Sequence, residues 1–302
     1  MDAEPVPATA DAAPVATPVA TPAATPPATA ATQDRARTLR AAEIVRDIAI
    51  GGIASLIAGI LVVGVGGRLV MRVIAALNPE ATGLLTTAGA TIGEITTGGT
   101  MFFVVMFGLL AGGTVGVVWA IVSPWIPGSG AVRALASALV AIAIGAFLVV
   151  RTDEGDFRKV APAAAIALLV VLFGVLGIAV AGLDERLRRR LPAASASSTA
   201  SQIAYVVLAT IGLVFVTFVV SAYFTRADFP TEPGVGFSAP VTVGVALVVV
   251  AVATIAAWWQ RVSTGEARLP RAFEVFGRGA LGVAVILGAI RLAGEVSGLL
   301  AA

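Results

Sequence analysis

Long apolar runs separated by short polar segments dominate the pattern of this chain. A bilayer core is about 30 Å thick, and roughly 20 apolar helical residues cross it. Six runs without a charged residue are Ile48–Gly67, Met101–Val122, Ala134–Val150, Val160–Leu183, Ile203–Phe224 and Ala239–Trp259. A seventh, Gly279–Ile290, is bracketed by Arg278 and Arg291. The pattern predicts an all-α, polytopic transmembrane helix bundle of about seven spans, near residues 48–70, 101–122, 133–150, 160–183, 203–224, 239–259 and 273–295.

The last span leaves two topologies open. Its uncharged core covers only about 18 Å of helix at a rise of 1.5 Å per residue. It crosses the bilayer if the side chains of Arg278 and Arg291 extend to opposite headgroup layers. If it lies in the interface instead, the chain has six crossings and a cytoplasmic C-terminus.

The first residues differ in composition from the rest. Seven prolines fall between Pro5 and Pro27 among Ala, Thr and Val, and such a segment cannot bury a core. We expect residues 1–40 to form a disordered, Pro/Ala/Thr-rich cytoplasmic tail, either a spacer or a segment that docks on a partner. Residues 41–302 are then one transmembrane domain, in keeping with 58% hydrophobic and 13% charged residues in the whole chain.

The basic residues predict the orientation of the bundle. With the N-terminus inside, the segments on the cytoplasmic side hold 12 basic residues and those on the opposite side hold 6, before the last helix. Cytoplasmic loops carry the excess of Lys and Arg in membrane proteins. The single lysine, Lys159, against nineteen arginines is typical of a GC-rich genome. We therefore expect the bacterial cytoplasmic (inner) membrane, with a cytoplasmic N-terminus.

The residue types that are missing restrict the chemistry. The chain has no histidine and no cysteine, which removes the commonest general base, thiol catalysis and most zinc sites. No basic patch with interleaved aromatic residues suggests nucleic acid. Spans two to six contain no Asp, Glu, Lys, Arg or Asn, which argues against an ion pump. We expect no catalytic residue, no metal and no cofactor.

The most distinctive polar stretch follows the first span. Arg68 and Arg72 are spaced i,i+4, so both project from one helix face, and the outer loop 78–100 contains Glu94 in a Thr- and Gly-rich segment. One interpretation is a binding site for a small anion or lipid headgroup, formed by Arg68, Arg72 and Glu94. The other is that the arginines anchor the helix at the interface and hold the loop through Glu94. The loop composition suits short extended segments or a hairpin.

This stretch resembles uncharacterised bacterial multi-pass membrane proteins that carry a GRxxMR segment followed by GExTxGGT. The matching residues are Gly67, Arg68, Met71 and Arg72, then Gly93, Glu94, Thr96, Gly98, Gly99 and Thr100. The resemblance covers only residues 67–100 and implies a membrane location without implying an activity.

Glycines on the second span predict close helix packing. Gly108, Gly112 and Gly116 share one helix face, and small residues at this spacing let a neighbouring backbone approach. We expect packing inside the bundle, with a dimer interface as the alternative. A separate cluster of Asp153, Glu154 and Asp156 has carboxylates that could hold a divalent cation, but a solvated turn is the simpler interpretation.

The sequence favours a non-catalytic structural or accessory protein, or a lipid-associated one. A facilitator or carrier for a small or lipophilic solute is the first alternative. A membrane enzyme that acts on lipid headgroups at the outer face is the second. The expected partners are membrane lipids and either further copies of this chain or another membrane protein.

Overall fold

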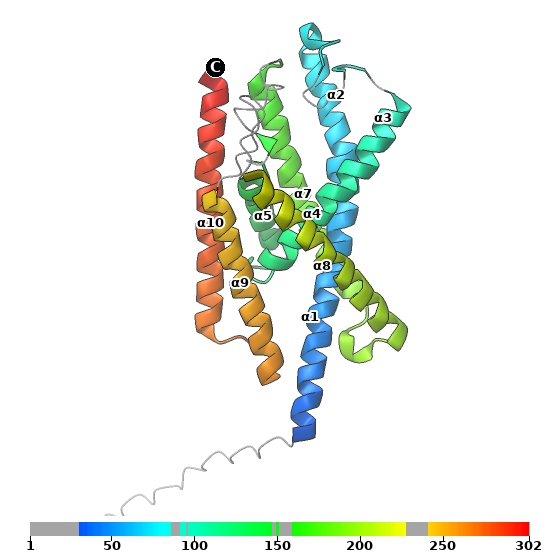
Figure 1. The fold of residues 1–302 in the computed structure, drawn as a ribbon, viewed down its shortest axis with the longest axis vertical. Coiled ribbons are helices and arrows are strands. Elements are labelled where there is room, and N and C mark those ends of the chain that lie inside the picture. The colour runs from blue at the N-terminus through cyan, green and yellow to red at the C-terminus, as the bar shows by residue number, and fades with distance from the viewer. Residues whose placement is uncertain are drawn as a thin grey trace, which may run out of the picture.

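The computed structural model describes residues 30–85, 91–94, 96–146, 149–150, 159–227 and 241–301, and most of them lie in long helices (Figure 1). The longest element is a rod made of α1 (Ala30–Ala58), the π-helical segment η1 (Gly59–Gly66) and α2 (Gly67–Leu77). The rod has 48 residues. At about 1.5 Å per residue it is far longer than a bilayer core is thick.

The other helices follow the apolar runs in chain order. A second rod joins α3 (Thr97–Phe102), the π-helical η3 (Phe103–Phe107) and α4 (Gly108–Val122), and a third joins α5 (Gly130–Ala141) and the π-helical η4 (Ile142–Ala146). Then come α7 (Pro162–Arg190), α8 (Thr199–Ala227), α9 (Val241–Thr264) and α10 (Arg271–Ala301). Two 3-10 turns, η2 (Pro79–Ala81) and η6 (Ala194–Ala196), lie in the connections. No strand forms within the described residues, and the expected all-α class is confirmed.

Five helical segments are long and apolar enough to cross a membrane: Ala30–Leu77, Thr97–Val122, Pro162–Arg190, Val243–Thr264 and Arg271–Ala301. Two further apolar helices, Gly130–Ala146 and Thr199–Phe215, are shorter. The chain is thus compatible with a membrane protein, and the count of seven crossings stays a prediction. The last apolar run, which the sequence leaves open, belongs to a 31-residue helix that meets the length and composition of a span.

The start of the first helix differs from the sequence prediction. The composition predicts a disordered tail over residues 1–40, whereas α1 begins at Ala30. No proline occurs between Pro27 and Pro79, and Ala, Gln, Arg and Leu in this segment favour helix. The early turns also gain tertiary contacts, because Arg37 and Arg40 donate hydrogen bonds to backbone carbonyls near the end of α9. A boundary between tail and helix that is predicted from proline content alone therefore falls too late in the sequence.

Close contact between α1–η1 and α4 holds the middle of the bundle. A Cβ on Gly112 would lie 2.8 Å from Leu56 Cα, and one on Gly108 would lie 2.8 Å from Ile60 Cα. From the other side, a Cβ on Gly59 would collide with the backbone of Gly112. Gly116 has more room, since its Cβ would meet the nearest atoms at 3.5 Å. The glycine ladder faces a helix of the same chain, and glycine lets these two backbones approach.

Glycines also set the contacts of α7 and α10. A Cβ on Gly177 of α7 would collide with the backbone of Ser137 in α5, and one on Gly288 of α10 would collide with Ala143 in η4. Near the other end of α10, Gly277 lies under the ring of Trp125. These contacts place α7 and α10 against the rod of α5 and η4.

A buried hydrogen-bonded group joins α4 to α9. Trp125 follows α4, and its Nε1 donates to Thr254 Oγ1 of α9 at 2.7 Å. Thr254 Oγ1 lies 2.7 Å from Ile121 O and 2.9 Å from Val250 O. Other span hydroxyls bond within their own helices, as Thr114 does to Leu110 O at 2.8 Å. Such bonds satisfy the hydroxyl without a ligand.

The loop between the first and second rods contains backbone hydrogen bonds between its two arms. Gly83 N donates to Ile92 O at 3.0 Å, Ile92 N donates to Leu84 O at 2.9 Å, and an antiparallel bridge joins Leu85 to Thr91. This agrees with the expected hairpin. The loop ends at Thr96, whose Oγ1 accepts a hydrogen bond from Gly99 N at 3.0 Å and caps α3. Buried Asn78 ends α2 and accepts a hydrogen bond from Ala161 N beside the start of α7.

Candidate functional site

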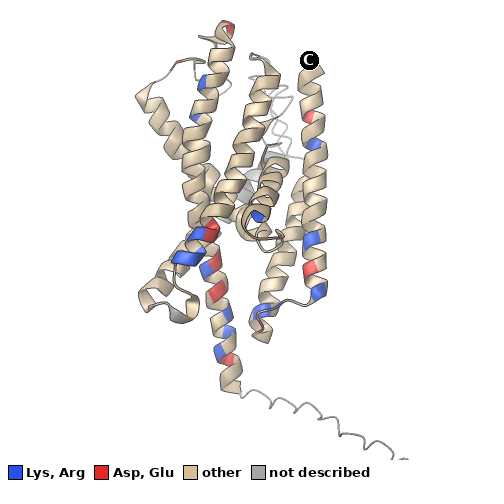
Figure 2. Cartoon of the chain, turned by 180° about the vertical axis from the view of Figure 1, so that it is seen from behind, with Lys and Arg blue, Asp and Glu red and all other residues tan. Residues whose placement is uncertain are grey.

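Charged residues are concentrated where α1 begins and where α7 and α9 end (Figure 2). We call this region the arginine-rich end. Its arginines come from the N-terminal part of α1, from the last turns of α7 and α9, from the α9–α10 loop and from the first turns of α5 and α10: Arg35, Arg37, Arg40, Arg46, Arg133, Arg186, Arg188, Arg189, Arg190, Arg261, Arg268, Arg271 and Arg278. The apolar parts of the same helices lie further along the bundle.

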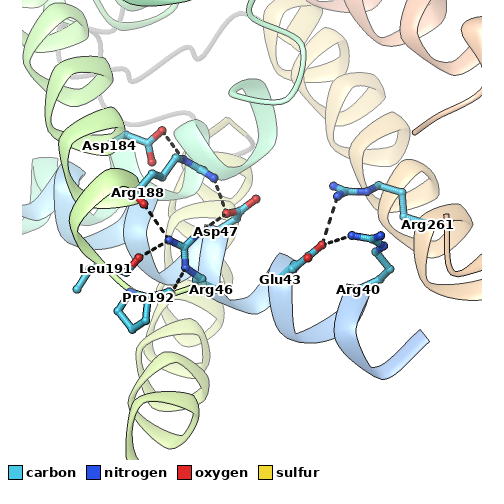
Figure 3. A network of polar contacts seen from close by, with 9 residues as sticks. All are labelled: Arg40, Glu43, Arg46, Asp47, Asp184, Arg188, Leu191, Pro192 and Arg261. Carbon is cyan, nitrogen blue, oxygen red and sulfur yellow. Dashed lines mark hydrogen bonds and ion pairs between the residues drawn. The ribbon is translucent and has the colours of Figure 1, made fainter. Parts of the chain in front are cut away.

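Arg188 is the centre of a partly buried ionic group (Figure 3). Its Nε donates to Asp184 Oδ2 at 2.9 Å, one turn earlier in α7. Its Nη1 donates to Asp47 Oδ1 of α1. Asp184 is only 1% exposed, so its carboxylate depends on Arg188 for charge compensation. The group fixes the register of α1 against α7 at this end.

Arg46 caps the C-terminus of α7. Its Nη2 donates to Arg188 O at 3.0 Å and to Leu191 O at 2.9 Å, and its Nε donates to Pro192 O at 2.7 Å. The last carbonyls of a helix have no partner inside it and carry partial negative charge, so a guanidinium there satisfies both needs.

Two other arginines of α1 do the same for the end of α9. Arg37 Nε donates to Ser263 O at 3.0 Å, and Arg40 Nε donates to Gly265 O at 3.2 Å. Arg40 also donates to Glu43 Oε2 at 2.6 Å, and Arg261 Nη2 lies 4.0 Å from the same oxygen (Figure 3). The N-terminal part of α1 is therefore hydrogen-bonded to the ends of both α7 and α9.

A cavity of about 530 Å³ opens at the arginine-rich end. Residues from α1, α4, the α4–α5 loop, α5, α7, α9 and the start of α10 line it. The polar lining residues are Asp47, Ser123, Ser129, Arg133, Asp184, Glu185, Arg188, Arg261, Arg268 and Glu274. The cavity thus combines charged side chains from distant parts of the chain with the N-terminus of α5.

Four buried side-chain polar atoms in the described residues lack a hydrogen-bond partner: Ser55 Oγ, Trp119 Nε1, Asp184 Oδ1 and Arg261 Nε. Two of them lie near Gly51 of α1, where a Cβ would be 3.4 Å from Trp119 Nε1 and 3.9 Å from Asp184 Oδ1. The same Cβ would be 2.8 Å from Trp119 Cδ1, so glycine here lets the indole ring lie against α1. Residues Asp184 and Arg261 also line the cavity.

The sequence-predicted cluster at the other end is more open. Half-buried Arg68 donates from Nε to Thr100 Oγ1 at 3.4 Å, while Arg72 and Glu94 are exposed. In the described part of the chain, no ion pair joins Glu94 to Arg68 or Arg72. The structure therefore places the arginines on one helix and the acid in the loop without bringing them into contact. The cluster Asp153, Glu154 and Asp156 lies outside the described residues.

Sequence analysis misses Asp47 and Asp184, because each lies one residue beyond the end of a charge-free run. A signal for one of them is present: Asp184 and Arg188 are spaced i,i+4, which favours an ion pair on a helix. No spacing links Asp47 of α1 to α7, since that contact exists only after the helices pack. Among the described residues, no group of three or more His, Cys, Asp or Glu side chains could hold a metal ion.

Comparisons with protein families, with curated proteins and with solved structures found no match to this chain.

Proposed function

We propose that this chain is a non-catalytic, lipid-associated or accessory protein of the bacterial cytoplasmic membrane. The observation that carries the proposal is the separation of its polar and apolar parts. Ionic groups and a polar cavity occur at the arginine-rich end, where the helices leave their apolar segments. In the middle, α1–η1 and α4 meet backbone to backbone at Gly59, Gly108 and Gly112. This arrangement suits a protein that contacts headgroups at one end, more than one that passes polar solutes through its centre.

The arginine-rich end is the proposed cytoplasmic end, because basic segments stay inside. Cysteine labelling tests this orientation directly, since the chain has no native cysteine. Arg268→Cys places a thiol on an exposed loop at this end, and Glu80→Cys places one on the opposite side. An impermeant maleimide should label only Glu80→Cys in intact cells, and both variants once the membrane is opened. Labelling of Arg268→Cys alone in intact cells would reverse the orientation.

Purified protein in proteoliposomes tests the functional class. We expect no increase in the flux of small solutes such as glycerol, measured by light scattering, relative to empty liposomes. We also expect native mass spectrometry to find phospholipid that stays bound through exchange into a mild detergent. Solute flux that exceeds the control, with no retained lipid, would replace this proposal by the facilitator.

One observation favours the facilitator as a second candidate. In the described part of the chain, the three π-helical segments η1, η3 and η4 interrupt helices, and η1 contacts η3. Such segments are often found at functional sites because they widen the helix and release backbone groups. A headgroup enzyme at the outer face has less support, because Arg68, Arg72 and Glu94 do not converge.

A further inference from the structure

The acidic and the basic side chains that line the cavity at the arginine-rich end differ in how completely they form ion pairs. The carboxylates that line it each have an arginine partner. The pairs are Asp47 with Arg188 and Arg46, Asp184 with Arg188, Glu185 with Arg189, and Glu274 with Arg278. Each lining carboxylate is therefore paired with a cation of the chain, although Asp184 Oδ1 accepts no hydrogen bond within the described residues.

The arginines of the lining are less well matched. Arg133 makes no ion pair within the described residues. Its Nη2 donates to Ser123 O at 3.2 Å, and its guanidinium carbon lies 5.6 Å from the centroid of the Trp119 ring. Arg261 has Glu43 at 4.0 Å, but Glu43 is already bound by Arg40 at 2.6 Å. The buried Nε of Arg261 has no acceptor among the described residues. Exposed Arg268 adds a third cation without an ion pair in the part of the chain that the structure describes.

The N-terminus of α5 adds a further positive element. Gly128 and Ser129, just before this 12-residue helix, line the cavity. Ser129 is the N-cap residue, and its side chain makes no capping hydrogen bond. The first N–H groups of a helix have no partner inside it and carry partial positive charge, so they favour an anion.

We infer that this cavity binds a phosphate group, held by Arg133 and Arg261 beside the N-terminus of α5. Guanidinium groups offer several N–H donors in a plane and match the oxygens of phosphate. An anion would interact favourably with three features of this cavity: the arginines without an ion pair, the N–H of Arg261 without an acceptor, and the uncapped N-terminus of α5. The phosphate belongs either to a phospholipid headgroup or to a soluble phosphate ester, and the first source rests on the proposed lipid-associated function.

Lipid binding to the purified full-length chain tests the inference. The probes are phosphatidylglycerol and diacylglycerol with the same acyl chains, added in a detergent without phosphate and counted by native mass spectrometry. We expect the wild-type chain to retain phosphatidylglycerol well above diacylglycerol. Arg133→Gln and Arg261→Gln should each weaken retention on the order of tenfold, the value of one hydrogen bond to a charged group. Arg133→Lys should recover only part of the retention, because lysine keeps the charge but lacks the planar set of N–H donors.

Arg190→Gln is the matched control, since exposed Arg190 lies at the same end but outside the cavity lining, and it forms no ion pair within the described residues. If Arg133→Gln and Arg261→Gln retain phosphatidylglycerol as the wild type does, the site is overturned while the lipid-associated function stands. Equal retention of the two probes by the wild type, together with no binding of glycerol 1-phosphate, overturns it without any variant, even if a variant fails to fold.

Glycerol 1-phosphate separates the two sources of phosphate. If it displaces phosphatidylglycerol from the wild type at similar concentration, and Arg133→Gln abolishes its binding, the ligand is a soluble phosphate ester and the site stands. Retention of phosphatidylglycerol that glycerol 1-phosphate does not compete assigns the site to the lipid. A wild type that binds neither overturns the phosphate site.

Discussion

The two ends of the rod formed by α1, η1 and α2 carry arginines in very different surroundings. At the arginine-rich end, Arg46 donates three hydrogen bonds to the carbonyls that end α7, and Asp47 accepts one from Arg188. At the other end, Arg68 donates a hydrogen bond to Thr100 Oγ1 at 3.4 Å, and Arg72 is exposed. The rod itself is continuous between them, so the difference comes from what lies opposite each end.

The difference shows that these charged side chains form defined contacts where a packed helix holds their partner. The partners of Arg46 and Asp47 lie on or just after α7, a helix whose position is set by packing along its length. The expected partner of Arg72 lies in a loop, where Glu94 has no helix to hold it. An ion pair between exposed groups gains little free energy and loses side-chain freedom. An acidic residue in a loop therefore gains little free energy by pairing with an arginine at the interface.

The largest expected effect comes from breaking the ionic group at the arginine-rich end. Arg188→Gln leaves Asp184 1% exposed and without its cation. We expect the free energy of unfolding to fall by about 3 kcal/mol, because an uncompensated buried charge remains. Equilibrium unfolding in mixed micelles measures this. Arg189→Gln is the control, since Arg189 is 76% exposed in its pair with Glu185 and should change stability by less than about 0.5 kcal/mol. Equal losses in the two variants would contradict the comparison.

A second prediction tests the close contact between the middle of the rod and α4. Gly112→Ala puts a Cβ 2.8 Å from Leu56 Cα and 2.9 Å from Ser55 O. It should force α1 and α4 apart and destabilise by about 1–3 kcal/mol. Gly116→Ala on the same face meets its nearest atoms at 3.5 Å, and its change should lie between zero and a gain of about 1 kcal/mol from helix propensity. Thermal midpoints in detergent compare the pair, and equal midpoints would contradict the close contact.

A third prediction concerns the cap on α7. Arg46→Gln removes the guanidinium that donates to Arg188 O, Leu191 O and Pro192 O. We expect a loss of about 1–2 kcal/mol, since several partly exposed hydrogen bonds to helix-end carbonyls are lost. Arg46→Lys should restore only part of it, because an ammonium keeps the charge but cannot reach all three carbonyls. Full recovery by lysine would show that charge alone stabilises the end of α7. Unfolding in mixed micelles again gives the values.

The sequence predicts the elements of this fold well and its long-range contacts poorly. Runs without charge identify the apolar helices, because lipid excludes charged side chains. Glycine spacing identifies a packing face on α4, but nothing in it names Gly59 and Leu56 of the first rod as the opposing surface. The cavity is invisible in the sequence for the same reason, since Arg133, Asp184 and Arg261 come from three helices. Composition also hides the early start of α1, whose first turns are hydrogen-bonded to the end of α9.

The smallest expected effect lies at the end opposite the arginine-rich one. The sequence predicts that Glu94 compensates Arg68 or Arg72, whereas the structure keeps Glu94 and Arg72 exposed and unpaired with each other. Glu94→Gln and Arg72→Gln should then each change stability by less than about 0.5 kcal/mol. Their double-mutant cycle should give a coupling energy near zero. The same cycle on Asp47→Asn and Arg188→Gln is the positive control and should give a coupling of about 1 kcal/mol or more, because those groups are in contact. A coupling of similar size between Glu94 and Arg72 would mean that the loop closes on the first rod in the membrane, and the contrast between the two ends would disappear.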